Sequence, residues 1–168
     1  KVREEIRAEV LDKGYCQERQ AFVQSYGSKN LDAANLMLPL VGFIPATDPM
    51  MRSTIRATQK ELTNEQGFVY RYTNYDDGLV GSEGSFIICT FWLADNLIHL
   101  GQLAEARDLL GSVIACANDL GLLSEEYDAA NGVMLGNFPQ AFSHLALINT
   151  AVQLQQATYG SSPSPSRT

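Results

Sequence analysis

A long internal repeat of helical segments is the strongest constraint that this sequence places on its fold. Three nearly uncharged runs begin at Leu31, Ser85 and Pro139, and each start lies 54 residues after the one before. The runs 31–44, 85–100 and 139–157 contain only two formally charged residues, Asp32 and Asp95. A helix that is apolar on nearly every side must be buried on nearly every side. We therefore expect these three runs to form inner helices.

Charged runs precede each uncharged run and hold sixteen charged residues between them. They cover residues 2–13, 48–62 and 102–120. Within the last of them, Leu103, Ala106 and Leu110 follow the three- and four-residue steps of an amphipathic helix. A helix with a single apolar stripe lies on a surface. The chain therefore alternates outer and inner helices, and so long a repeat of helical hairpins indicates a solenoid or a closed ring.

The predicted fold is all-α, with three outer/inner hairpins that make up about half of an (α/α)6 toroid over residues 1–156. The open flanks of such a half-ring expose inner-helix surface that needs a partner. We expect that partner to be a missing N-terminal half of the same domain. Pro39 predicts a kink or an early stop in the first inner helix, and Asn137 is the predicted N-cap of the last one. The Ser- and Pro-rich residues 157–168 are predicted to be a disordered tail.

The connections between the predicted helices differ in length in a regular way. Inner helices lead to outer helices through short links, whereas outer helices lead to inner helices through residues 14–30, 63–84 and 121–138. In antiparallel hairpins all three long loops fall at one end of the array. Loops of this length are most often functional, so a site is expected at that end. Segments such as Ala21–Tyr26 and Phe68–Tyr72 alternate and predict short β-hairpins within these loops.

Charge and cysteine content narrow the function further. The net charge of −7 argues against a nucleic-acid partner and against an anionic membrane surface. Cys16, Cys89 and Cys116 are odd in number and unclustered, which favours reduced thiols and a cytoplasmic setting. The histidines His99 and His144 are isolated and do not form a metal site. No metal and no cofactor are therefore predicted.

Two segments of the chain carry a recognisable pattern. The third long loop contains Ser124-Glu125-Glu126-Tyr127-Asp128, followed by the string from Leu135 to Leu147 that begins Leu-Gly-Asn-Phe-Pro-Gln. The second long loop contains Tyr70-Arg71-Tyr72, followed by the string from Ser85 to Leu93. These segments resemble the glucoamylase, glucodextranase and trehalase-like enzymes of glycoside hydrolase family 15, and the resemblance extends over about residues 2–153.

This resemblance implies an (α/α)6 barrel that hydrolyses terminal α-glucosidic bonds with inversion, acting on an oligosaccharide or glucoside substrate. It implies that Glu125 is the general base that activates water and that Arg71 binds sugar hydroxyls. The further predicted substrate-binding residues, which surround these two in the loops, are Tyr72, Glu83, Glu126 and Tyr127. Inversion independently needs a carboxylic acid and a carboxylate about 6.5–9.5 Å apart, so that a water molecule fits between base and sugar.

The acid of this pair is not apparent in the sequence. In the family it lies in a Trp-Glu-containing segment, whereas the single tryptophan here, Trp92, precedes Leu93. The chain is therefore expected to supply the base but not the acid, and to be inactive or nearly so by itself.

Simpler interpretations of the same residues remain open at this stage. Arg71 could anchor its loop to a carboxylate, and Glu83 could favour a helix N-terminus. Tyr72 and Tyr127 could pack loops instead of stacking on sugar. For the whole chain, the alternatives are a non-catalytic carbohydrate-binding or regulatory glucoamylase-like domain, and a helical peptide-binding scaffold. The scaffold suits the sequence poorly because tetratricopeptide arrays repeat at about 34 residues.

Overall fold

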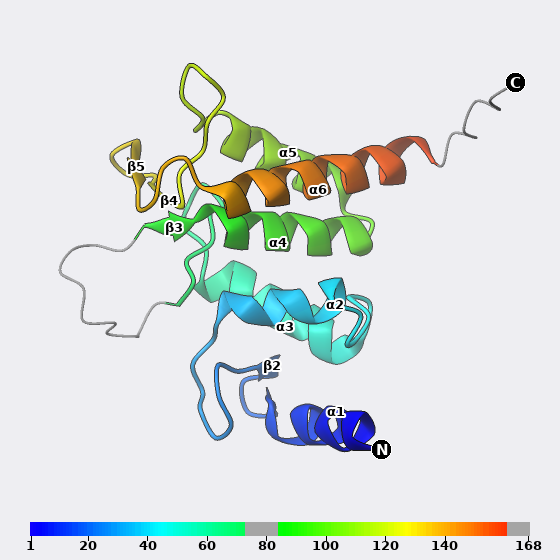
Figure 1. Cartoon of the computed structure of the whole chain (residues 1–168). Coiled ribbons are helices and arrows are strands. Elements are labelled where there is room, and N and C mark those ends of the chain that lie inside the picture. The colour runs from blue at the N-terminus through cyan, green and yellow to red at the C-terminus, as the bar shows by residue number, and fades with distance from the viewer. Residues whose placement is uncertain (73–83, 161–168) are drawn as a thin grey trace, which may run out of the picture.

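The computed structural model describes residues 1–72 and 84–160. The chain forms outer helices, inner helices and short strands in an order that follows the predicted alternation (Figure 1). The outer helices are α1 (Val2–Lys13), α3 (Pro49–Glu61) and α5 (Leu103–Ile114). The inner helical segments are the 3-10 helix η1 (Ala33–Leu36), α2 (Met37–Leu40), α4 (Ile87–His99) and α6 (Ala141–Tyr159).

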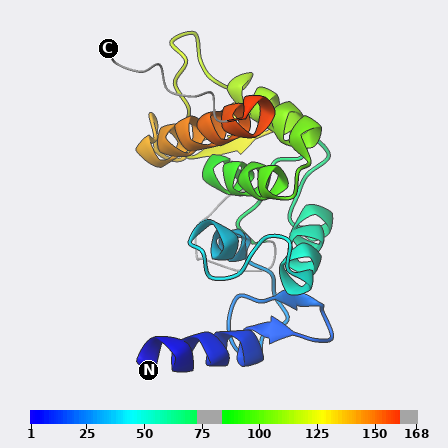
Figure 2. The same cartoon turned by 90° about the vertical axis from the view of Figure 1, so that its right-hand side faces the viewer.

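Inner and outer helices form two adjacent columns. Figure 2 shows α2, α4 and α6 stacked beside α3 and α5, with α1 at the far end of the stack. Helix α4 lies at the centre and packs against α2, α5 and α6. It buries ten of its residues, including Asp95, whereas α3 buries the single stripe of Met51, Thr54, Ile55 and Thr58. The half-toroid architecture predicted from the charge pattern is confirmed.

The early stop predicted at Pro39 is confirmed, while two other helix ends differ from the predicted ones. Pro39 has no N–H group to donate to the Asn35 carbonyl, and the first inner segment is a 3-10 turn followed by an α-helix that ends at Leu40. The third outer helix ends at Ile114 and not near residue 120. The last inner helix continues to Tyr159, three residues into the segment predicted as a tail. Residues 161–168 lie outside the described ranges.

Short strands lie in or beside the long loops, and the three strands of one sheet gather at the end of the array (Figure 1). β1 (Tyr15–Cys16) pairs with β2 (Ala21–Phe22), and a second sheet has the strand order β3-β4-β5. These strands are β3 (Ser85–Phe86), β4 (Glu126–Asp128) and β5 (Val133–Leu135). Both sheets are antiparallel. The prediction of a short hairpin is confirmed at Ala21–Phe22, whereas Phe68–Tyr72 forms only an isolated bridge between Val69 and Thr63. The second sheet places Glu126 of β4 beside Phe86 at the start of α4.

The repeat in the sequence reappears as a repeat of backbone hydrogen bonds. Ala33 is the first residue of η1, and its N–H donates to the Arg71 carbonyl over 2.9 Å. Ile87 is the first residue of α4, and its N–H donates to the Glu125 carbonyl over 3.0 Å. Donors and acceptors are each 54 residues apart. Arg71 and Glu125 therefore occupy equivalent positions above two neighbouring inner helices.

A side chain in the first turns of α4 and of α6 makes a further contact to the preceding long loop. The Thr90 hydroxyl accepts a hydrogen bond from the Val69 N–H over 3.0 Å. The equivalent position is His144, whose Nε2 lies 3.3 Å from the Leu123 nitrogen. A backbone N–H can only donate, so Nε2 is the unprotonated nitrogen and Nδ1–H donates to the Gln140 carbonyl. His144 therefore acts as a neutral structural histidine that holds the loop before Glu125.

Helix α6 is an inner helix with one uncovered side. Its buried side includes Ser143, Ala146, Thr150 and Leu154. Apolar side chains on its other side are exposed at spacings of three and four residues; they are Phe142 (64%), Leu145 (57%), Ile148 (58%) and Val152 (45%). Within the described ranges no helix has both the length and the apolar character needed to span a membrane.

Asp95, one of the two charged residues of the inner runs, is buried between α4 and α6. Its Oδ1 accepts a hydrogen bond from the Thr150 hydroxyl over 2.6 Å, and its side chain lines a cavity of about 380 Å³ together with Trp92 and Asn149. Burial raises the pKa of the Asp95 carboxyl above its usual value, although the Thr150 hydroxyl and nearby His99 oppose this effect. Burial therefore disfavours the charged form of the Asp95 carboxyl in the folded protein.

We predict that Asp95→Asn raises the melting temperature of the complete protein at neutral pH. A carboxyl with a raised folded-state pKa contributes its stability fully below the unfolded value of about 3.9 and loses it as pH rises through the folded pKa. Asparagine keeps an acceptor for Thr150 without a charge. The advantage should shrink toward about pH 4 in thermal unfolding scans. Asp119→Asn, at an exposed position, should show no such trend; a neutral-pH loss for Asp95→Asn would contradict the prediction.

Candidate active site

Glu125 lies in the long connection between α5 and α6, directly before strand β4. Both of its backbone groups are hydrogen-bonded: its carbonyl accepts from Ile87 of α4, and its N–H donates to the Asn137 carbonyl over 2.9 Å. The neighbouring Ser124 is buried, and its carbonyl accepts from the Ser143 hydroxyl of α6. Two inner helices thus fix the backbone of Glu125 at the long-loop end of the array.

The carboxylate of Glu125 is held by one neighbouring residue. Its Oε2 accepts the backbone N–H of Asn137 over 3.0 Å and the Asn137 side-chain amide over 2.7 Å. Gly136 passes close beside it with φ of +70°, and a Cβ at that position would lie 2.9 Å from the same Oε2. Among the described residues both hydrogen bonds of this half-buried carboxylate go to Oε2, which leaves Oε1 available to another group.

The prediction that Asn137 caps the last inner helix is wrong. The N-cap is Gln140, whose side chain accepts from the Phe142 N–H. Asn137 lies outside the helix and directs its amide to Glu125 instead. Asparagine before an expected helix start is typical of a cap, so local sequence alone favours the wrong partner.

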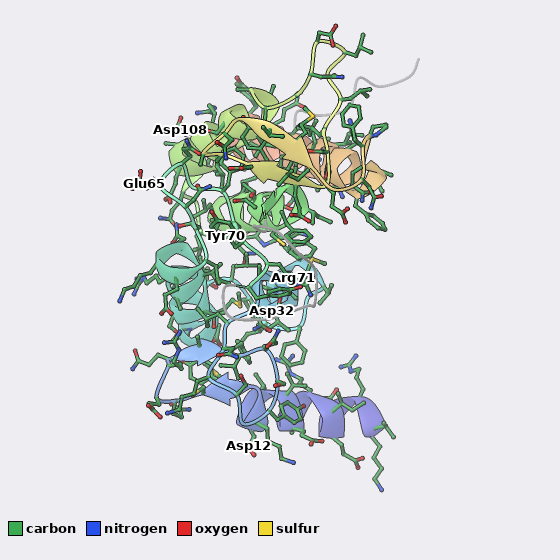
Figure 3. All side chains as sticks on the ribbon, turned by 90° about the vertical axis from the view of Figure 1, so that its left-hand side faces the viewer. Asp12, Asp32, Glu65, Tyr70, Arg71 and Asp108 are labelled. Atoms are coloured by element: carbon green, nitrogen blue, oxygen red, sulfur yellow. The ribbon has the colours of Figure 1, made fainter. Side chains whose placement is uncertain are left out.

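Arg71 forms an ion pair at the equivalent position above the first inner segment. Its Nε lies 2.6 Å from Asp32 Oδ1, and the two side chains are 35% and 12% exposed. Figure 3 shows the two residues side by side. Burial disfavours the charged guanidinium, but the hydrogen bond and the charge of Asp32 outweigh it, so the pKa of Arg71 is raised. The interpretation of Arg71 as a carboxylate anchor is therefore supported, and the exposed part of its guanidinium still faces outward.

Asp32 joins two functions at this point. Its Oδ1 also accepts from the Ala34 N–H over 2.7 Å and so caps η1. A charged residue in an otherwise uncharged inner run was the signal that could have identified it as the partner of Arg71. Tyr72 follows Arg71 in the chain and is half-buried.

Glu126 points to the second long loop. Its Oε2 accepts the Gly84 N–H over 3.0 Å, and a Cβ on Gly84 would lie 3.1 Å from that oxygen. Glu126 therefore ties β4 to the residue that precedes β3. Glu83, the other predicted sugar-binding carboxylate, lies outside the described residues.

Tyr127 packs against other side chains of the loops. Its ring lies 5.6 Å from that of Phe68, centroid to centroid, and burial together with the neighbouring Cys116 thiol raises the pKa of its hydroxyl. Burial likewise raises the pKa of Cys116. These contacts favour a packing role for Tyr127 over contact with sugar.

The predicted site residues that the structure describes gather at one end of the array, in loops beside the starts of adjacent inner helices. Glu125, Glu126 and Tyr127 adjoin the start of α4, whereas Arg71 and Tyr72 adjoin the start of η1. Residues 1–72 and 84–160 contain no group of three or more histidine, cysteine or acidic side chains arranged to hold a metal ion. The site that this arrangement forms is a rim with one carboxylate and one guanidinium in repeat-equivalent places.

Comparison with known proteins assigns the family. The model of glycosyl hydrolases family 15 matches residues 1–103 and 100–152. The chain is 49% identical over 156 residues to a trehalase of Thermoplasma volcanium and 45% identical over 158 residues to a trehalase of Mycolicibacterium smegmatis. Each match covers 93% of this chain. The chain therefore belongs to glycosyl hydrolase family 15.

These matches also show how much of such a protein the chain represents. It spans 25% and 23% of the length of the two trehalases. A wild-type glycosidase structure matches 92% of the chain with a TM-score of 0.77 and 24% identity, and the chain covers 43% of it. A variant of a glycosidase in complex with glucose matches with a TM-score of 0.78 and 23% identity. These structural matches confirm the fold. The chain covers less than half of the length of each matched glycosidase chain.

We predict that Asp32 contributes more to stability than a simple helix cap does. Asp32→Ala removes both the cap of η1 and the partner of Arg71, whereas Asp32→Asn retains an acceptor for Ala34. Asp48→Ala is the matched control, because Asp48 caps α3 through the Met50 N–H and should cost about 1 kcal/mol. Leaving a partly buried charge unpaired adds to the loss.

The free energy of unfolding of the complete protein, measured in urea, should therefore fall most for Asp32→Ala. The free energy of unfolding of Asp32→Asn should lie between that of Asp32→Ala and that of the parent protein. Equal losses for Asp32→Ala and Asp48→Ala would show that the pairing with Arg71 adds nothing.

Proposed function

We propose that the complete protein, meaning the longer polypeptide that contains this chain, is an inverting α-glucosidase whose substrate is the glucose disaccharide trehalose. The observation that carries this proposal is the fixed carboxylate of Glu125 at the long-loop rim, one repeat away from Arg71. The names of the relatives support trehalose over other glucosides. Starch ends and other terminal glucosides are the alternative substrates.

Glu125 acts as the general base in this proposal. Its free Oε1 takes a proton from a water molecule while the water oxygen bonds to the anomeric carbon. A carboxylic acid on the opposite side of the sugar protonates the oxygen of the breaking glycosidic bond, and glucose leaves. Asn137 already occupies Oε2, so the carboxylate presents one defined oxygen to the water.

Arg71 binds hydroxyl groups of the terminal glucose. A guanidinium has five N–H donors in a rigid fork, and Asp32 uses the Nε–H. The ion pair fixes the plane of the fork, which leaves the terminal N–H groups for sugar. Tyr72 completes this part of the pocket, and Glu126 shapes it by accepting the Gly84 N–H. Glu83 keeps its predicted role as a sugar-binding carboxylate.

The general acid comes from the part of the complete protein that this chain does not contain. The relatives are about four times longer, since the chain covers 25% of the first of them. That part also covers the exposed apolar side of α6, because a glycosidase toroid matched by this chain extends well beyond it. We therefore infer that the catalytic pocket is completed only when the two halves of the ring meet.

The base assignment predicts the effect of Glu125→Gln in the complete protein. A positioned general base contributes about 10²–10⁴-fold, so kcat for trehalose should fall by that factor while KM stays similar. The control is Glu65→Gln, which makes the same charge change at an exposed position of the second long loop. Glucose release from trehalose and maltose should be measured in parallel.

Three outcomes of this experiment are distinct. Activity of Glu125→Gln within about tenfold of the parent would contradict the base assignment. Faster release of glucose from maltose than from trehalose would contradict trehalose as the substrate and favour another terminal glucoside. Absence of glucose release from either sugar by the parent protein would favour the non-catalytic regulatory domain.

The half-ring proposal predicts the behaviour of substitutions on the exposed side of α6. Leu145→Lys or Ile148→Lys places a charge where the other half must pack, so each should lower the melting temperature and activity of the complete protein. Asn149→Lys is the control, because it introduces the same charge at an exposed polar position of the same helix, next to the cavity beside Asp95.

In the isolated chain the two apolar substitutions, Leu145→Lys and Ile148→Lys, should instead reduce self-association in light scattering. A monodisperse monomer of the unsubstituted chain would contradict an apolar face that needs a partner.

A further inference from the structure

We propose that Asn137 is a positioning residue for Glu125, with Gly136 providing the space that this contact requires. The inference rests on the proposed role of Glu125 as the general base. It assigns to Asn137 the task of fixing which carboxylate oxygen faces the water molecule.

The geometry of the pair is specific. Three hydrogen bonds join Glu125 and Asn137: the Glu125 N–H donates to the Asn137 carbonyl, and the Asn137 N–H and side-chain amide both donate to Oε2. The last of these is short, at 2.7 Å. Two donors on one oxygen restrict rotation of the carboxylate plane, so Oε1 is held in one direction. A general base needs this, because proton transfer requires a hydrogen bond of defined length and direction.

Asn137 is itself fixed by the fold. It lies between β5 and α6, and the Gln140 N–H that follows it donates to the Leu123 carbonyl. Leu123 in turn is fully buried. Two backbone hydrogen bonds, from Gln140 to Leu123 and from Glu125 to Asn137, therefore join the segment that carries the Glu125 carboxylate to the segment that carries Asn137. Asn137 is an exposed residue whose hydrogen bonds are nevertheless concentrated on one partner.

The chemistry of the amide suits a base. An amide N–H₂ can only donate, and an ionised carboxylate can only accept. Aspartate has the same shape as asparagine but would place a second carboxylate against Oε2.

Gly136 makes the close approach possible. Its φ of +70° is a backbone conformation that residues with a Cβ rarely adopt. A Cβ built there would lie 2.9 Å from Glu125 Oε2 and 3.0 Å from Glu125 Cβ. Any larger residue would therefore strain the backbone and displace the carboxylate.

The first test compares two asparagine-to-aspartate variants of the complete protein. Asn137→Asp should lower kcat for trehalose by at least about tenfold, with KM within about threefold, because substrate binding is retained while the base is misdirected. Asn131→Asp is the matched control. Asn131 donates to Asp128 Oδ2 over the same 2.7 Å in the same loop, and its replacement should leave kcat unchanged.

A double-mutant cycle separates positioning from folding. In a Glu125→Gln background the residual activity, measured at raised enzyme concentration, should change by less than about twofold when Asn137→Asp is added. Additive losses would show that Asn137 acts on the structure at large and would overturn the inference. A kcat of Asn137→Asp within about twofold of the parent would do the same, even where Glu125→Gln is inactive. Full activity of Glu125→Gln would instead refute the proposed function.

Glycine variants give an independent readout. Gly136→Ala and Gly101→Ala both force alanine into a left-handed conformation, at φ of +70° and +77°. A Cβ at Gly101 meets nothing within 4 Å. Both variants should lower the melting temperature, Gly136→Ala by more because its Cβ also meets Glu125, but only Gly136→Ala should lower kcat. Equal kcat values for the two variants would contradict the role of Gly136.

Discussion

The hydrogen bond between the first residue of an inner helix and the crossing segment above it determines where the site lies. The N–H groups of the first helical turn have no partner within their helix. At Ala33 and Ile87 this need is met by the carbonyls of Arg71 and Glu125. Each crossing segment is therefore held at the helix start. The side chain of the residue that carries the bonded carbonyl, Arg71 or Glu125, is held there with it. The rim residues are placed by the regular spacing of the inner helices, although the loops that carry them are long and irregular.

Two charged side chains of the inner helices show how the same architecture treats charge. Asp32 lies at the rim, where a helix start and Arg71 both stabilise its carboxylate. Asp95 lies below the rim between α4 and α6, where the Thr150 hydroxyl donates to its carboxyl and burial raises its pKa. Within the inner helical segments, the ion-paired carboxylate therefore lies at the end of the array where sugar chemistry is proposed, and the carboxyl below it lies where burial disfavours the charged form.

Much of this architecture could be predicted from the sequence because its signals are local. Helical periodicity and the loss of charge identify the inner segments without knowledge of their partners, and loop length identifies the rim. The contacts that define the site are not local. Arg71 pairs with Asp32, 39 residues away, and Asn137 binds Glu125 instead of capping α6. Tyr127 has an aromatic ring of the kind that can stack on sugar, but this ring packs on Phe68. Each residue type fits two roles, and only the folded chain determines which neighbour is close enough.

The same hydrogen-bond rule explains why the half-ring is open at α6. Ala141 is the first residue of α6 and lies 54 residues after Ile87, as Ile87 does after Ala33. Within residues 1–72 and 84–160 no carbonyl accepts from the Ala141 N–H. Ala33 and Ile87 are fully buried, whereas Ala141 is exposed beside the apolar side of α6. Among the described residues, the start of α6 therefore lacks the carbonyl contact that accompanies burial at the starts of η1 and α4, on the same side of the array that exposes the apolar side chains of α6.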